Sequence, residues 1–282
     1  MTGSKNYIQF ISFENKLEGN EELAYRYIYG PITSRRLGVS LGVTTVPHKV
    51  CSFNCIYCEV GKTTLLTTER KEYIPAEAIL EELKDFLSKN TTKIDHITFS
   101  GLGEPTLHIR LGYIIKEIKK MTNISIAVLS NGSLITRDDV KMDLLNADIV
   151  KFTLNATDQE TYEKISLNHP DIKVQDVISG IVEFRKMFTH ELWIEILLVK
   201  GINNTIQNYL NLYNALSMIK PDKIHINTVI RAPAYKVEPL SFAELLEASR
   251  IINHGSKIIY KKGTTRVAPQ TEISTSSLNS NI

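Results

Sequence analysis

All three cysteines of the chain lie within eight residues, in the segment CSFNCIYCEVG, as Cys51, Cys55 and Cys58. An odd number of thiols crowded this closely does not make a disulfide framework, and converging thiols in a reducing compartment are typical metal ligands. Structural zinc takes four ligands, and a cubane cluster of four irons normally takes four thiolates. The triplet therefore predicts either a zinc ion with His48 as fourth ligand, or an iron–sulfur cluster with one iron open to a small molecule.

The spacing C-x3-C-x2-C, with Tyr57 directly before the last cysteine, resembles the cysteine loop of the radical S-adenosylmethionine (SAM) enzymes. The resemblance implies that Cys51, Cys55 and Cys58 hold a [4Fe–4S] cluster whose open iron chelates the amino and carboxylate groups of SAM. It implies reductive cleavage of SAM to methionine and a 5′-deoxyadenosyl radical, with Tyr57 packed near the adenine. The expected protein is an enzyme that abstracts hydrogen from a substrate that the sequence does not identify.

Alternating β-rich and amphipathic segments predict the fold that positions these cysteines. We expect strands at residues 38–46, 95–99, 124–129, 148–154, 192–199 and 223–229, and helices at residues 75–87, 109–121, 137–145, from 159, 174–188, 206–219 and 242–252. Strands that each precede a helix indicate an α/β fold with a parallel sheet. Six such units cannot close the usual eight-stranded barrel, so we expect an open, partial (β/α)6 TIM-like barrel. A doubly wound open sheet is the alternative, because the pattern alone does not separate the two.

Ligands of parallel α/β folds gather at the carboxyl ends of the strands. The strand at 95–99 is followed by SGLGEP, in which glycines let the backbone approach a ligand closely. The resemblance implies that the Gly103 backbone and the Glu104 carboxylate bind the amino group of SAM. The alternative is an ordinary strand-to-helix turn.

The next two strands end in Ser130-Asn131 and in Asn155. The resemblance implies that these polar side chains contact the ribose hydroxyls or the methionine carboxylate of SAM. For Asn131 the alternative is a turn residue before Gly132. Asp158 is interpreted as the cap of the helix that follows it.

Several charged or polar residues are candidates for contact with substrate. Glu195 lies within the apolar run WIEILLV, and an acidic residue in a buried strand is costly unless it is paired or lines a cavity. We expect Glu195 to face the barrel interior as a catalytic residue on the substrate side, with a salt bridge as the alternative. His225 and Asn227 share a strand face, and a structural role is favoured for His225. Arg35 and Arg36 could bind a phosphate or carboxylate of substrate, or form salt bridges on the rim.

Composition sets outer limits on function. The 282 residues are 43% hydrophobic and 23% charged, which excludes a disordered or collagen-like chain. A net charge of +2 does not favour nucleic acid as a partner, and the basic residues Lys257, Lys261, Lys262 and Arg266 are interpreted as a solvated face. No apolar stretch approaches the ~20 residues of a membrane span, and no secretory signal begins the sequence. We expect a cytoplasmic protein.

Weaker motifs narrow the resemblance. The segments YGPITSRRLGVSLGV, SGLGEPTLH and NTVIRAPAYKVEPL resemble the iron–sulfur oxidoreductases related to the wybutosine-base synthases of tRNA. Those synthases have additional cysteines for a second cluster, which this chain lacks, so a single-cluster member is expected. We predict an N-terminal extension at 1–28, a core at 29–255, and a C-terminal segment at 256–282 with a flexible Ser/Thr/Asn-rich tail.

The expected chemistry needs an electron from outside, because the chain has no further redox centre of its own. A ferredoxin or flavodoxin is the expected partner. A different class of function stays open at this point, namely a non-catalytic scaffold or electron-transfer protein that binds zinc or a cluster at the triplet.

Overall fold

A nine-stranded sheet organises the described part of the chain, residues 25–260 and 264–267 of a computed structural model. Its strands, in spatial order, are β1 (Ile28–Ser34), β2 (Gly38–Val43), β5 (His96–Phe99), β6 (Ser125–Ser130), β7 (Ile149–Thr153), β8 (Glu191–Leu198), β9 (Lys223–Thr228), β10 (Lys257–Tyr260) and β11 (Thr264–Val267). The strands from β2 to β10 pair in parallel, whereas β1 and β11 pair antiparallel at the two edges. The sheet curls into a half-barrel.

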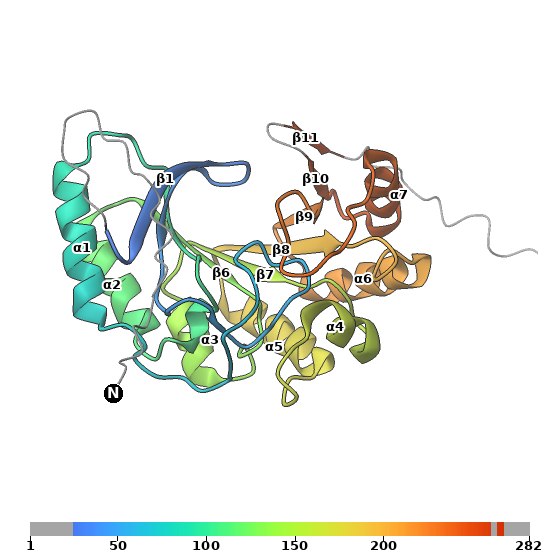
Figure 1. Cartoon of the computed structure of the whole chain (residues 1–282), viewed down its shortest axis with the longest axis horizontal. Coiled ribbons are helices and arrows are strands. Elements are labelled where there is room, and N and C mark those ends of the chain that lie inside the picture. The colour runs from blue at the N-terminus through green and yellow to red at the C-terminus, as the bar shows by residue number, and fades with distance from the viewer. Residues whose placement is uncertain (1–24, 261–263, 268–282) are drawn as a thin grey trace, which may run out of the picture.

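Helices follow the parallel strands and lie along the outer side of the curled sheet (Figure 1). They are α1 (Ala76–Lys89), α2 (Leu111–Met121), α3 (Asp138–Leu144), α4 (Gln159–Ser166), α5 (Val174–Met187), α6 (Ile206–Ile219) and α7 (Phe242–Ile252). Side-chain oxygens of Asp158, Thr205 and Ser241 accept from backbone amides in the first turns of α4, α6 and α7. The predicted capping role of Asp158 is thereby confirmed.

The strand order decides between the two predicted folds. Parallel strands β2, β5, β6, β7, β8 and β9 are neighbours in sequence order, without the reversal that defines a doubly wound sheet. The predicted partial TIM barrel is therefore confirmed.

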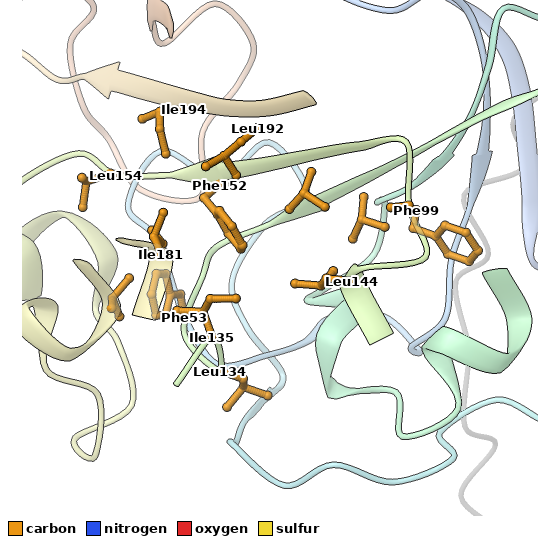
Figure 2. Packing of buried hydrophobic residues seen from close by; sticks show 14 of the residues in the cluster. Phe53, Phe99, Leu134, Ile135, Leu144, Phe152, Leu154, Ile181, Leu192 and Ile194 are labelled. Carbon is orange, nitrogen blue, oxygen red and sulfur yellow. The ribbon is translucent and has the colours of Figure 1, made fainter. Parts of the chain in front are cut away.

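The two faces of the sheet differ in chemistry. On the outer face, Phe99, Phe152 and Ile194 are buried against the helices in one large apolar cluster (Figure 2). Phe53, from the cysteine loop, joins the same cluster and meets the ring of Tyr162 edge-on at 5.7 Å. The loop is thus anchored by burial of an aromatic side chain, which removes its apolar surface from water.

The inner face of the sheet holds a small apolar cluster and, beside it, charged residues. A second apolar cluster, Leu37, Ala127, Ile149 and Trp193, lies at the amino ends of the strands. Lys151 on β7 pairs in register with Trp193, and Glu195, two residues beyond Trp193 on β8, pairs in register with His225 on β9. The inner face therefore changes from apolar to charged toward the ends where ligands bind.

Strands β1, β10 and β11 were not expected from the sequence. Ile28–Ser34 contains Gly30-Pro31, and its register shifts between Tyr29 and Ile32. Proline has no amide to donate, so a strand that contains it belongs at a sheet edge. The predicted N-terminal extension and flexible tail fall largely outside the described residues. Within the described part, no helix is both long and apolar enough to cross a membrane.

Candidate active site

The cysteine loop begins at the carboxyl end of β2 and returns before α1. Cys51 lies in β3 (Val50–Cys51), which pairs with β4 (Leu65–Leu66) in a separate two-stranded sheet. Cys51 and Cys55 are buried, and Cys58 is half-buried with its amide donating to the Cys55 carbonyl at 3.1 Å. All three thiols therefore occupy one short, well-anchored segment.

The thiols interact electrostatically with one another and with a buried ammonium. Burial and the neighbouring Cys51 and Cys58 raise the pKa of Cys55 to about 12, and burial raises the pKa of Cys51 to about 11. Burial also lowers the pKa of Lys49, but the nearby sulfurs outweigh this and raise it above its ordinary value. Two buried thiols and a half-buried one beside this cation are suited to a metal group that stabilises their thiolate forms.

The zinc alternative would need His48 as its fourth ligand. His48 Nε2 lies 3.3 Å from the Val60 carbonyl oxygen. Across residues 25–260, no three histidine, cysteine or acidic side chains converge closely enough to hold a single metal ion. The donor set of three soft thiolates fits an iron–sulfur cluster, whose several irons spread the ligands over a larger volume.

The Glu104 carboxylate, at the carboxyl end of β5, connects its own turn to the turn after β6. Its Oε1 accepts from the Thr106 amide (3.0 Å), the Thr106 hydroxyl (2.6 Å) and the Ser130 hydroxyl (2.8 Å), and its Oε2 accepts from the Asn131 amide (2.8 Å). Burial raises the pKa of Glu104, against the effect of these hydrogen bonds. Oε2 has capacity for a further donor, and contact with a SAM amino group stays a prediction.

Asn131 connects this network to the cysteine loop. Its side-chain amide donates to Ser52 Oγ at 2.9 Å and toward Cys51 Sγ at 3.7 Å. Ser52 also bonds Ser133 at 2.6 Å. The turn after β6 thus holds Cys51 in place. This role of Asn131 is consistent with its alternative interpretation as a turn residue.

Gly103 lies directly against the cysteine loop. A methyl group built on Gly103 would lie 1.9 Å from the Val50 carbonyl oxygen and 2.7 Å from Val46 Cγ2. The same carbonyl accepts the Glu104 amide at 3.1 Å. Only glycine lets these two loops approach so closely.

A hydrogen bond joins Tyr57 of the cysteine loop to Asn155, which follows β7. The Asn155 side-chain amide donates to the Tyr57 hydroxyl at 2.8 Å, and Asn155 Oδ1 accepts the Leu197 amide at 2.8 Å. Its carbonyl accepts from Asn203 and Asn208. Asn155 is therefore a rigid link between β7, β8 and the aromatic residue of the cysteine loop.

Glu195 faces the inner side of the sheet, where it is ion-paired. It bonds Arg36 and Lys151 and accepts from the Asn227 amide at 3.1 Å. Burial alone would raise the pKa of Glu195, but the charges of Arg36 and Lys151 hold it at about 2. The carboxylate is thus charged and paired, and its predicted catalytic role stays untested.

Two charged residues of the site, Lys49 and Lys151, were not predicted from the sequence. Lys49 stands two residues before Cys51, and Lys151 lies mid-strand in IVKFT just as Glu195 lies in WIEILLV. Opposite charges inside neighbouring apolar strands signal a buried pair, so the signal for Lys151 was present in the sequence.

Comparisons with known proteins agree with this geometry. Residues 45–212 match the Radical SAM superfamily. The chain belongs to this superfamily, and with it come the implied [4Fe–4S] cluster and SAM. More narrowly, it belongs to the UPF0026 family, since UPF0026 protein MJ1312 of Methanocaldococcus jannaschii is 35% identical over 227 residues, 80% of this chain and 70% of that protein.

Two further similarities define the extent of the match. The Brachyspira hyodysenteriae protein named GTPase Obg is 36% identical over 237 residues, 84% of this chain but only 35% of that protein. This chain thus spans about a third of that relative. The crystal structure of a radical SAM methyltransferase from Sphaerobacter thermophilus has a TM-score of 0.60 at 14% identity, covering 79% of this chain and 67% of that one. It supports the fold alone.

Proposed function

We propose that this protein is a radical SAM enzyme that abstracts hydrogen from its substrate. The observation that carries the proposal is the hydrogen-bonded connection of three strand-end turns to the cysteine loop, through Glu104, Asn131 and Asn155. A metal scaffold needs only the cysteines, whereas a ligand bound beside them needs polar groups held rigidly at the same edge of the sheet.

Cys51, Cys55 and Cys58 would hold the cluster. When bound and reduced, it supplies the electron that cleaves SAM to methionine and a 5′-deoxyadenosyl radical. Lys49, which is 3% exposed, places a positive charge beside the thiolates and offsets their negative charge. Asn131 donates toward Cys51 Sγ, and hydrogen bonds to cluster sulfurs tune the potential.

The remaining residues of this chain would orient SAM. Glu104 Oε2 accepts from the amino group, Ser130 and Asn131 hold Glu104 in position, and Gly103 allows the backbone to come close. Asn155 fixes the Tyr57 hydroxyl, so that the ring presents a constant surface to the adenine. Glu195 would act from the substrate side of the inner face.

Three finer assignments belong to the same proposal. A ferredoxin or flavodoxin would deliver the electron, and the protein would work in the cytoplasm, where such reductants and free thiols occur. The relation to the wybutosine-synthase branch is supported by the motifs YGPITSRR and NTVIRAPAYKVEPL. It concerns ancestry rather than reaction, because no cysteines remain for a second cluster.

The test is anaerobic reconstitution with iron and sulfide, followed by a SAM-cleavage assay with dithionite. The wild-type chain is expected to bind about four irons and to form 5′-deoxyadenosine. Cys55→Ser is expected to lose the cluster, whereas Glu104→Ala keeps the iron and weakens SAM binding by about tenfold or more. Exposed Glu247→Ala is the control. Stoichiometric zinc without SAM binding would favour the scaffold, and wild-type SAM affinity in Glu104→Ala would exclude the assigned role of that turn.

A further inference from the structure

The inner face of the sheet holds a group of charged side chains. They are not among the residues proposed to bind the iron–sulfur cluster or SAM. Arg35 and Arg36 lie in the turn between β1 and β2, Lys151 on β7 and Glu195 on β8. We call these four residues the inner charge cluster. Arg36 and Lys151 both bond the single Glu195 carboxylate, so the cluster has an excess of two positive charges.

The turn is held over this face from both sides. The amides of Arg36 and Leu37 donate to Ser34 Oγ at 3.3 and 3.2 Å. The Leu37 side chain is buried in the apolar cluster with Trp193, and its carbonyl lies 2.7 Å from His96 Nδ1. The two arginines are therefore presented by a fixed backbone rather than by a free loop.

Among the described residues, the carboxylates that act on Arg35 are Glu195, which Arg36 and Lys151 already share, and Glu59. Burial and the charges of Arg36 and Arg231 lower the pKa of Arg35. The charges of Glu195 and Glu59 act in the opposite direction. Arg231 and Glu59 pair with each other at 2.8 Å, so they cancel. Within residues 25–260, the positive charge around Arg35 is therefore not matched by a further carboxylate.

Several buried polar atoms around the cluster also have no hydrogen-bond partner within the described residues. They are Arg35 Nη1, Arg36 Nε, His225 Nδ1 and Asn227 Oδ1. His225 is 4% exposed and Asn227 5% exposed, and Asn227 Nδ2 bonds Glu195 at 3.1 Å. Buried polar groups are nearly always paired, and an unpaired one costs about 1–3 kcal/mol. A gathering of such atoms beside uncompensated cations indicates a ligand.

We propose that Arg35, Arg36 and Lys151 bind a phosphate monoester group of the substrate on the inner face of the sheet. Guanidinium groups match phosphate oxygens with paired donors. Two surplus positive charges balance a phosphate dianion, whereas a carboxylate would balance one. His225 and Asn227 then offer neutral partners for hydroxyl or amide groups next to the phosphate. This inference rests on the proposed function, because it identifies the substrate class for the same site.

The experiment is equilibrium binding of inorganic phosphate, with acetate as the comparison, to the reconstituted full chain at constant ionic strength. Wild type is expected to bind one phosphate per chain, at least about tenfold more tightly than acetate. Arg35→Met, which keeps the apolar stem and removes the charge, is expected to weaken phosphate binding by about tenfold or more. The control Arg250→Met changes an exposed arginine on α7 and is expected to leave phosphate binding unchanged.

SAM affinity, measured in parallel, separates this site from the cofactor site. Arg35→Met is expected to bind SAM as wild type does. If this variant lost SAM affinity together with phosphate affinity, the inner charge cluster would serve SAM, and the inference would be overturned. Acetate binding equal to phosphate binding, or equal phosphate binding by wild type and Arg35→Met, would also overturn it. Should Arg35→Met not fold, the stoichiometry and anion preference of the wild type decide. Failure of SAM cleavage alone would count against the proposed function, because phosphate binding is read without turnover.

Discussion

Glu104 shows how one side chain sets the geometry of the site. Its carboxylate accepts four hydrogen bonds from Thr106, Ser130 and Asn131, and it is 2% exposed. A buried carboxylate is tolerated only when it is paired or hydrogen-bonded this completely. The residue therefore has a structural role that operates before any ligand binds, and its predicted contact with SAM would add to that role.

His225 gives the inner face a measurable pH dependence. Burial, and then the charges of Arg36, Lys151 and Lys257 against that of Glu195, lower its pKa to about 3. An unfolded histidine takes up a proton near pH 6.5, whereas the folded chain keeps His225 neutral down to about pH 3. The contribution of His225 to the free energy of unfolding is therefore fully present above about pH 6.5. It is lost as the pH falls from there toward about 3.

We expect the loss to amount to about 2 kcal/mol between pH 7.5 and pH 5. Urea unfolding of wild type and His225→Gln at the two pH values measures it, and the variant is expected to lose about 2 kcal/mol less than wild type. Exposed His190→Gln is the control and should follow wild type. Equal pH dependence of wild type and His225→Gln would show that His225 is not held neutral in the folded chain.

At the scale of elements, the central contact is between the turn after β5 and the cysteine loop. Gly103→Ala would place a methyl group against the Val50 carbonyl, next to Cys51. The two loops must then separate, and we expect a loss of stability of about 2 kcal/mol or more, together with weaker retention of iron after reconstitution.

Gly61→Ala is a matched control in the cysteine loop. Its added methyl group would meet nothing within 4 Å, although its φ of +104° carries a backbone penalty, about 1 kcal/mol. Thermal unfolding and iron content of both variants check the prediction. Full iron retention by Gly103→Ala would mean that the loops do not need this contact.

Elements that rest on local pattern could be predicted, and those that rest on long-range pairing could not. Strands β2, β5, β6, β7, β8 and β9 and the helices after them have runs of apolar residues or helical periodicity, and the structure contains each of them. Strands β3 and β4 have two residues each. Such segments are too short to show a periodicity, and they are extended only because a partner strand lies beside them.

For the molecule as a whole, the sequence predicted the half-barrel because the order of strands and helices allows few topologies. It also indicated which strand ends carry polar residues. It did not reveal that Glu104, Asn131 and Asn155 bond mainly to the protein itself, because hydrogen-bond partners depend on the distances between loops. Likewise, Glu195 was expected inside the barrel, but its pairing with Lys151 and Arg36 depends on strand register.

The most direct test of a three-cysteine cluster completed by SAM is electron paramagnetic resonance of the reduced, anaerobically reconstituted chain, recorded with and without SAM. We predict a [4Fe–4S] signal that changes when SAM is added, with hyperfine coupling to ¹⁵N in the amino group of labelled SAM. An unchanged signal without that coupling, or a chain that takes up only zinc, would contradict the proposal.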